Sequence, residues 1–289
     1  MLAALGDLLE DIIVSQRESL HAASDTAASI VRRRGGSASC VAHVAAQRGA
    51  PSRFIGQVGD DDIGRSLVGR LGSAGVDTSP VRYSGTTGTI VVLVDEVGER
   101  TMFTDRRTCL ALSHPDETWL DGVDVLHVPI YSLVEPPISE CAEVVIAWAH
   151  EQGIAVSIDV SSVSVIKSYG RSKVVDLIRR LTPEVVFANE EEARVLDVTS
   201  SLVGTTTVVE HGARSAVVYS PDRAPLTIRA NTIDTVSDTT NAGDAFAAGF
   251  LTYRSVPGAA AAGRPLWTDD PAAACRAGHN AAAALIASR

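Results

Sequence analysis

The stretch from Asp238 to Leu251 reads Asp-Thr-Thr-Asn-Ala-Gly-Asp-Ala-Phe-Ala-Ala-Gly-Phe-Leu. Its threonines and asparagine favour a turn and a helix cap, and its small and apolar residues from Ala245 onward predict a buried helix. The first turn of a helix offers unpaired N–H groups and a partial positive charge, which together bind an anion. The stretch therefore predicts an anion-binding turn that runs into a packed helix, and the rest of the chain is arranged around it.

A carboxylate, Asp244, lies inside this predicted anion site. A carboxylate repels an anion, so its presence needs an explanation. One explanation is that Asp244 takes a proton from a hydroxyl while the amides of Asn241, Ala242 and Gly243 hold the phosphoryl group that this hydroxyl attacks. The alternative is an ordinary capped helix with an acid in its first turn.

These residues resemble the C-terminal signature of the ribokinase-like (PfkB) carbohydrate kinases, usually Asp-Thr-x-Gly-Ala-Gly-Asp-x-Phe. The resemblance implies that Asp244 is the catalytic base and that the preceding amides form the anion hole. Asn241 stands where the family has its first Gly, a variation that the family tolerates. The resemblance also implies ATP and Mg²⁺ as cofactors, with K⁺ as a candidate monovalent cation at Asp238 and Thr240.

The composition restricts the class of protein. The chain has 289 residues, 45% hydrophobic and 21% charged, which is typical of a soluble globular protein. Its net charge of −10 argues against nucleic acid as a partner. Neither of its two lysines, Lys167 and Lys173, belongs to a G-x-x-x-x-G-K motif, which excludes a P-loop NTPase. The H-R-D and D-F-G motifs of protein kinases are missing as well. We therefore expect ATP to be bound by backbone amides, Mg²⁺ and selected arginines.

The cysteines and the hydropathy pattern indicate the compartment. The four cysteines are far apart and no C-x-x-C occurs, which argues against zinc. No apolar run is long enough to span a bilayer, and the N-terminus lacks the basic leader of a signal peptide. We expect a reduced, cytoplasmic protein with no membrane partner.

The N-terminal segment predicts one strand near 2–6 and a second near 11–17. Asp11 follows Gly6 by five positions, as an acid does in the opening strand of the family. The resemblance implies that Asp11 hydrogen-bonds hydroxyls of the sugar. The alternative is a polar turn with solvated acids.

Three β-rich runs, 26–34, 88–94 and 100–105, lie away from any βαβ rhythm and predict a small lid sheet. We place the lid at about 11–34 and 81–106, and expect a homodimer formed through it. Arg106 follows the last run, and the resemblance implies that it reaches the substrate. A surface salt bridge is the alternative for this arginine.

Gly35 and Gly36 predict a tight turn that feeds a helix of small residues. The family reads G-G-x-x-x-N-x-A here, which implies that both glycines and the residue at the Asn position, Cys40, lie beside the substrate. A thiol cannot replace the donor and acceptor pair of an amide. The departure at Cys40 therefore leaves the fold assignment intact but weakens the assignment of a common sugar as substrate. The preceding run Arg32-Arg33-Arg34 is interpreted as a solvated strand edge because the chain is acidic overall.

The stretch 54–64 resembles the G-x-V-G-x-D-x-F-G motif of the family, with Ile63 in place of Phe. It predicts a strand end and a helix start, with acids favoured in the first helical turn, and the helix itself over 65–74. The three adjacent acids of this stretch lack the spacing of an EF-hand.

From Val123 onward the pattern is a regular alternation of strands and helices, which predicts a parallel sheet covered on both faces. The predicted strands are 123–129, 154–159, 185–188, 207–210, 216–219 and 226–229, the helices are 139–152, 172–181 and 271–288, and 255–270 is a predicted loop.

Two motifs in this part match nucleotide-site positions of the family. Asn189 and Glu192 match N-x-x-E, whose acid organises Mg²⁺ and water around the ATP phosphates; an acidic helix start is the alternative. His211 and Gly212 match a turn beside the nucleotide, and Asn280 matches a position that lines the adenine pocket. Family members usually continue past the last helix into a loop that helps to bind the monovalent cation, whereas this chain ends at Arg289.

The resemblance covers essentially the whole chain and implies one ribokinase-like α/β domain over 1–289: a central, mostly parallel sheet flanked by helices, with a small β lid. The implied activity is transfer of the γ-phosphoryl group of ATP to a hydroxyl of a small carbohydrate. A nucleoside kinase of the same fold remains an alternative, although only 4% of the residues are aromatic. A binding or regulatory protein is a second, because Cys40 and Ser215 depart from the family pattern. A Rossmann dehydrogenase is disfavoured because no G-x-G-x-x-G follows the first strand.

Overall fold

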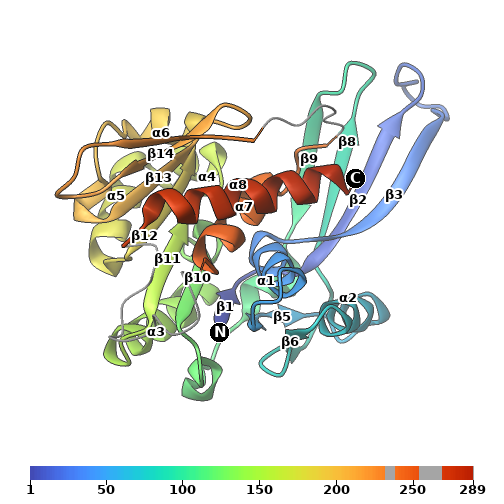
Figure 1. Ribbon diagram of the computed structural model, residues 1–289. Helices are drawn as coiled ribbons and strands as arrows, with labels where there is room; N and C mark the ends of the chain where they lie inside the picture. Colours follow the sequence, from blue (N-terminus) through green and yellow to red (C-terminus); the bar gives the residue numbers. More distant parts are fainter. Residues whose placement is uncertain (232–237, 254–268, 289) are drawn as a thin grey trace.

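The computed structural model describes residues 1–231, 238–253 and 269–288, and within them a nine-stranded sheet forms the centre of the molecule (Figure 1). Its strand order is β15-β14-β13-β12-β11-β10-β1-β4-β6. All neighbours from β13 to β6 are parallel, and the two pairs at the β15 edge are antiparallel. The strands are β1 Leu2–Leu5, β4 Ser52–Ile55, β6 Val76–Asp77, β10 Val125–Pro129, β11 Ala155–Asp159, β12 Val185–Asn189, β13 Thr206–Glu210, β14 Ser215–Tyr219 and β15 Leu226–Arg229.

Helices cover both faces of this sheet, because its strands are apolar on both sides. In β1, for example, Ala3 and Leu5 enter one core, while Leu2 and Ala4 enter the other. This confirms the predicted α/β class. One face carries α1 Ser37–Gln47, α2 Asp62–Ser73, α7 Ala242–Leu251 and α8 Pro271–Ala287; the other carries α3 Ile138–Glu151, α4 Val163–Tyr169, α5 Arg171–Leu181 and α6 Glu190–Leu196.

Helix α7 is clamped between the sheet and α8. A side chain at Gly249 of α7 would place its Cβ 2.5 Å from the carbonyl oxygen of Ala277, so the two helices approach as closely as only glycine permits. On the other side, the ring of Phe250 meets Phe187 of β12 edge to face, at 5.3 Å between centroids. Helix α7 is therefore packed closely on both sides.

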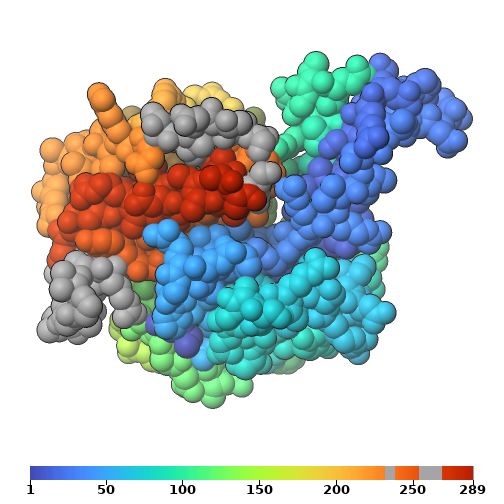
Figure 2. Space-filling model, turned by 45° about the vertical axis from the view of Figure 1, so that its right-hand side comes forward, coloured from blue at the N-terminus to red at the C-terminus, as the bar shows by residue number. Residues whose placement is uncertain are grey.

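A second, four-stranded sheet projects from the body of the molecule (Figures 1 and 2). Its order is β3-β2-β8-β9, with an antiparallel pair at each edge and a parallel pair, β2 and β8, in the middle. We call it the lid sheet. It is formed by β2 Leu9–Gln16, β3 Ala28–Gly35, β8 Thr89–Val94 and β9 Arg100–Asp105. Residues 81–88, predicted as part of the lid, contain instead the short strand β7 Arg82–Tyr83, which pairs with β5 Gln57–Val58.

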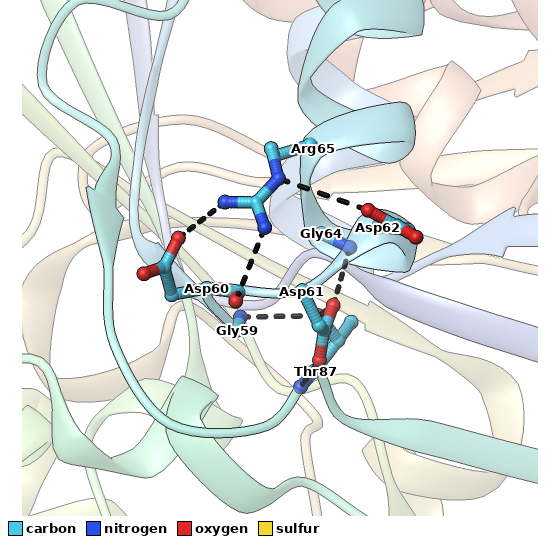
Figure 3. A network of polar contacts seen from close by, with 7 residues as sticks. All are labelled: Gly59, Asp60, Asp61, Asp62, Gly64, Arg65 and Thr87. Atoms are coloured by element: carbon cyan, nitrogen blue, oxygen red, sulfur yellow. Dashed lines mark hydrogen bonds and ion pairs between the residues drawn. The ribbon is translucent and has the colours of Figure 1, made fainter.

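A polar network fastens the root of the lid sheet to α2 (Figure 3). Asp61 caps this helix by accepting a hydrogen bond from the amide of Gly64 at 2.8 Å. The same carboxylate accepts from the amide and the hydroxyl of Thr87, at 2.8 and 2.6 Å, just ahead of β8. Arg65 pairs with Asp60 beside it. The predicted helix start is confirmed, and the helix begins three residues earlier than expected because Asp61 supplies the cap.

One further difference concerns a single helix. Helix α4 was not predicted, because its seven residues are too few to show a clear helical period. The loop predicted at 255–270 lies outside the described residues, apart from its last two positions.

Candidate active site

The ends of the parallel strands meet at one edge of the sheet, and a cavity of about 610 Å³ lies there. In open α/β sheets, ligands bind outside the carboxyl ends of the strands. Here those ends present a set of polar side chains to the cavity: Asp7 after β1, Tyr131 after β10, Asp159 of β11, Asn189 of β12 and Glu210 of β13. The sheet thus builds the floor of the site from segments far apart in the sequence.

Two other elements complete the walls. The turn 238–241 and the first residues of α7 form one wall, and the inner face of the lid sheet forms the roof. The roof is mixed in character, with Asp11, Ser15, Arg33, Arg100 and Thr104 among apolar side chains. Its apolar members are Leu9, Ile13, Ile90, Val92, Val94 and Met102.

The turn before α7 has the backbone shape that the sequence suggested, with one change. Asn241 is the N-cap of α7 and adopts the left-handed conformation, φ 62°, which explains why Gly or Asn suits this position. The amide of Ala242 donates to the carbonyl of Thr239 at 3.1 Å. Of the three amides predicted to hold an anion, that of Ala242 is therefore engaged within the turn, and those of Asn241 and Gly243 remain the candidates.

Asp244 lies in the first turn of α7 and faces the cavity. The hydroxyl of Ser37, from the first turn of α1, donates to its Oδ1, and the thiol of Cys40 also bonds to it. Burial raises the pKa of Asp244 to about 7, against the effect of these two bonds. The charge of Asp159 adds to the rise and that of Arg34 opposes it. A carboxyl with this pKa is poised to exchange a proton near neutral pH.

Asn189 and Glu192 are joined in a capping box at the start of α6. Glu192 accepts from the Asn189 amide at 2.9 Å and from its side-chain Nδ2 at 2.7 Å. Both residues nevertheless line the cavity. Burial, followed by the charge of Asp159, raises the pKa of Glu192 to about 7. Asn189 and Glu192 can therefore cap α6 and still face a ligand in the cavity.

Four carboxyl groups, those of Asp159, Glu192, Glu210 and Asp244, face this one cavity. Burial raises the pKa of Asp159 to about 6, and burial together with the other three carboxylates raises that of Glu210 well above its usual range. Such mutual repulsion fits a site that is completed by a cation. Among the described residues no three acids, histidines or cysteines are placed to hold a metal directly.

On the lid side, Arg106 and Asp7 form a nearly buried pair. The guanidinium donates to both carboxylate oxygens of Asp7, at 2.7 and 2.8 Å, and both side chains line the cavity. Arg106, predicted to reach the substrate, is therefore held by Asp7, which the sequence analysis did not single out. Asp11 lies on β2 with its carboxylate against Gly35, where a Cβ would come within 2.2 Å of Oδ1. Gly36 passes equally close to the Asp7 carbonyl, so both glycines are required by packing beneath the site.

Five of the predicted ligands lie outside the cavity lining, the first being Gly35, which packs against Asp11. Cys40 is 1% exposed, packs in the core and bonds to Asp244. His211 and Gly212 form the turn between β13 and β14, where His211 pairs with Glu190 at 3.5 Å. Asn280 is exposed on α8 and accepts a hydrogen bond from Asn231. The roles predicted for Gly35 and Cys40 at the substrate, and for the other three residues at the nucleotide, remain predictions.

Several cavity residues were missed by sequence reasoning, and most share one signal. Asp7, Asp159 and Glu210 come at or directly after the ends of predicted parallel strands, which is where a site in this kind of sheet is expected. Ser37 gave no comparable signal, because its bond to Asp244 joins positions 207 residues apart. The arginine run was interpreted as a solvated edge; Arg32 is mostly exposed, but Arg33 lines the cavity.

In the described parts of the chain, the structure contains no helix that is both long enough and apolar enough to cross a membrane. This agrees with the hydropathy of the sequence.

Comparison with known proteins identifies the family. The chain is 30% identical over 236 residues to a fructosamine kinase of Bacillus subtilis, covering 75% of each protein. It is 32% identical over 241 residues to an ATP-dependent ribose-1-phosphate kinase of Halopiger xanaduensis, covering 79% of this chain and 76% of that protein. Its fold resembles the crystal structure of an adenosine kinase from Sinorhizobium meliloti, with a TM-score of 0.82 at 23% identity over 99% of this chain and 93% of that one. The family model of the pfkB carbohydrate kinases matches residues 1–289, and the chain therefore belongs to the pfkB family of carbohydrate kinases.

Proposed function

We propose that this kinase transfers the γ-phosphoryl group of ATP to a hydroxyl of a small carbohydrate, with Asp244 as the general base. The observation that carries the proposal is the position of Asp244: in the first turn of α7, facing the cavity, with a pKa raised by burial to about 7. A base with this pKa removes a proton efficiently at neutral pH. The adjoining amides of Asn241 and Gly243 lie where negative charge develops on the transferred group.

The bond between Ser37 and Asp244 defines how the acceptor enters. Ser37 donates to Oδ1 and the Cys40 thiol also bonds to the carboxylate, so the acceptor hydroxyl uses a remaining lone pair or displaces one of these two donors. The hydroxyl oxygen forms the new bond to the γ-phosphorus as the bond from that phosphorus to the β–γ bridging oxygen breaks. ADP leaves with that oxygen, and the proton of the hydroxyl passes to Asp244. The lid sheet covers this point and excludes water, which would otherwise accept the phosphoryl group.

Mg²⁺ fits the acidic floor described above. Glu192 and Asp159 would hold its waters, and the ion would neutralise charge on the ATP phosphates. With a positive ion nearby, the carboxyl groups of both residues would be ionised at neutral pH, because an opposite charge lowers a raised pKa. Asn189 orients Glu192 through the two hydrogen bonds of the capping box.

The acceptor is proposed to be a sugar derivative rather than a free simple sugar. Polar groups at Asp7, Asp11 and Arg106 suit hydroxyls, whereas the apolar patch on the roof suits a substituent. The fructosamine kinase and the ribose-1-phosphate kinase named above point to substituted sugars as well. The same apolar patch favours a nucleoside as the second candidate acceptor. A purely regulatory protein is disfavoured by the intact position of Asp244.

The test is an acceptor screen in which ADP formation from Mg·ATP is followed with simple sugars, fructosamines, sugar phosphates and nucleosides. We expect turnover with a substituted sugar, and its loss in Asp244→Asn. Turnover that survives in Asp244→Asn would reject this residue as the base, while a preference for nucleosides would reject the sugar assignment and leave the chemistry intact.

We also propose a homodimer formed through the lid sheet and a cytoplasmic location. The outer face of the lid sheet exposes apolar side chains, with Ile30 63% and Phe103 59% exposed, which suits a homodimer formed through the lid. Light scattering of the purified chain tests this: a monomer at micromolar concentration would exclude it. A cytoplasmic location fits the use of ATP and the four free, buried cysteines.

A further inference from the structure

Asp238 is held by two arginines of the lid sheet. Its Oδ2 accepts a hydrogen bond from Nη1 of Arg33 at 3.0 Å, and its Oδ1 accepts one from Nη2 of Arg100 at 3.0 Å. Oδ1 also accepts from the amide of Thr240 at 2.9 Å. Arg100 makes a second bond, from Nη1 to the hydroxyl of Thr240. The carboxylate is only 17% exposed, so these charge-assisted bonds are partly shielded from water.

The two arginines come from opposite edges of the lid sheet. Arg33 belongs to β3 and Arg100 to β9, which are the first and last strands in its order. Asp238 and Thr240 belong to the turn that leads into α7 and its anion-binding amides. Both edges of the lid are thus tied to the turn that has to be in place for phosphoryl transfer.

This arrangement does not fit a monovalent cation at Asp238 and Thr240, the positions at which the sequence suggested K⁺. Both carboxylate oxygens of Asp238 and the hydroxyl of Thr240 already accept hydrogen bonds from guanidinium groups. A third positive charge at this point would be repelled by two arginines that never lose their own. The chain supplies its own cations to this turn.

We propose that Arg33 and Arg100 are positioning residues that replace a monovalent cation at Asp238, so that the anion-binding turn is ordered by lid contact and needs no K⁺. The proposal rests on the proposed function for the meaning of the turn, but the contacts that carry it are independent of the acceptor. Arg100 is the stronger of the two, because it bonds to both Asp238 and Thr240, whereas Arg33 bonds to Asp238 alone.

The first experiment compares cations on the wild-type protein. Rates with the best acceptor from the screen are measured in KCl and in choline chloride at equal ionic strength, because ion pairs respond to salt in general. We expect less than a two-fold difference. A saturable rise of five-fold or more with K⁺ would overturn the proposal while leaving the kinase assignment intact.

The second experiment compares three arginines of the lid. Arg100→Ala should lower kcat by about 10- to 100-fold, the size expected when a catalytic group is misplaced by an ångström, and change the KM for ATP by less than three-fold. Arg33→Ala should lower kcat by about three- to ten-fold. The kcat of Arg100→Lys should lie between those of the wild type and Arg100→Ala, because lysine keeps the charge but cannot bond to two acceptors as the planar guanidinium does. Arg32→Ala is the matched control: it is adjacent on β3 but pairs with Glu10, and should stay within two-fold of the wild type.

A third measurement needs no acceptor. Hydrogen exchange of the backbone amides of residues 238–244 should quicken at least three-fold in Arg100→Ala, remain unchanged in Arg32→Ala, and be unaffected in the wild type when choline is replaced by K⁺. Unchanged exchange in Arg100→Ala would show that lid contact does not order the turn, and slowing by K⁺ in the wild type would show that a cation does. Either result rejects the proposal, whichever acceptor the enzyme uses.

Discussion

Two aspartates at the starts of two helices have opposite environments. Asp61 caps α2 at the root of the lid, and Asp244 lies in the first turn of α7. Burial acts to raise the pKa of Asp61, but hydrogen bonds from Thr87 and the amide of Gly64, with the charge of Arg65, lower it below its ordinary value. For Asp244 burial prevails, and the pKa rises to about 7.

The difference in pKa distinguishes a helix-start aspartate with a structural role from one suited to catalysis. The carboxylate of Asp61 accepts hydrogen bonds from backbone amides and a hydroxyl, so its charge stabilises the junction between α2 and the lid sheet. Asp244 is placed where water is scarce and other carboxylates are near, which makes its charge costly in the absence of ligands. Because its folded-state pKa is above the ordinary value, the folded chain binds more protons than the unfolded one between about pH 4 and 7. Asp244 therefore opposes folding as pH rises through this range.

The largest expected effect is on kcat, when each of the two aspartates is replaced by Asn. Asp244→Asn should lower kcat by roughly two to four orders of magnitude, the usual contribution of a general base. It should not lower the melting temperature at pH 8, because it removes a costly buried charge. Steady-state kinetics and a thermal melt check both expectations. Asp61→Asn is the control for helix-start aspartates, since it keeps a capping oxygen and should change kcat by less than three-fold.

The pH dependence should show the same contrast. Since the active form of Asp244 is deprotonated, the acid limb of the kcat/KM profile should have an apparent pKa near 7, and the rate should fall about ten-fold for each pH unit below it. The pKa of Glu192 is also raised to about 7, so its titration contributes to the same limb. A profile that stays flat down to pH 5 contradicts a base with a raised pKa.

Much of the fold followed from the sequence, because period and turn chemistry are local properties. The alternating strands and helices from Val123 onward and the hairpin of β8 and β9 lie close to their predicted positions. Within the site, the sequence indicated Asp244 and Asp11 through motifs, and the structure places both against the cavity. It could not indicate that Ser37 would bond to Asp244 or that Arg100 would meet the turn before α7, because those contacts join strands and helices that only tertiary packing brings together.

Glu192 tests whether a capping acid also has a chemical role. Glu192→Gln should raise the Mg²⁺ concentration for half-maximal rate by about three- to ten-fold and leave the affinity for the acceptor nearly unchanged, because a neutral amide attracts a hydrated cation less. Mg²⁺ titrations of both proteins at saturating acceptor measure this. The cap itself should survive, since Gln can still accept from the Asn189 amide. If the two titrations coincide, Glu192 serves only the start of α6.

Asp61 should affect stability rather than chemistry. Asp61→Ala removes the cap of α2 and the link to Thr87, which should lower the free energy of unfolding by about 1 to 2 kcal/mol. Because the folded-state pKa of Asp61 is lowered, its contribution is present above the ordinary aspartate pKa and lost as pH falls through the folded value. Denaturant unfolding at pH 7 and pH 3 should therefore show a smaller difference between wild type and variant at the lower pH. Equal differences at both pH values would mean that the cap does not depend on charge.

Substitution of Cys40 should have the smallest effect on the rate. It tests whether this residue acts on the base or on the acceptor, because it bonds to Asp244 but stands at the position where the family has a substrate ligand. Its thiol bonds to the base and is 1% exposed, so Cys40→Ala should remove one hydrogen bond that lowers the pKa of Asp244. Because a thiol is a weak donor, this hydrogen bond is worth about 0.5 to 1.5 kcal/mol, which moves the acid limb of the pH profile upward by at most about one pH unit.

Cys40→Ser restores a donor of similar size and should return the limb toward its wild-type position. The ratio of kcat/KM values between two acceptors should be the same in all three proteins, since a residue that lies outside the cavity and bonds to the base acts on every acceptor alike. A change in that ratio by ten-fold or more, with the acid limb unmoved, would instead assign Cys40 to the acceptor site, because only a group that contacts the acceptor can discriminate between its hydroxyls.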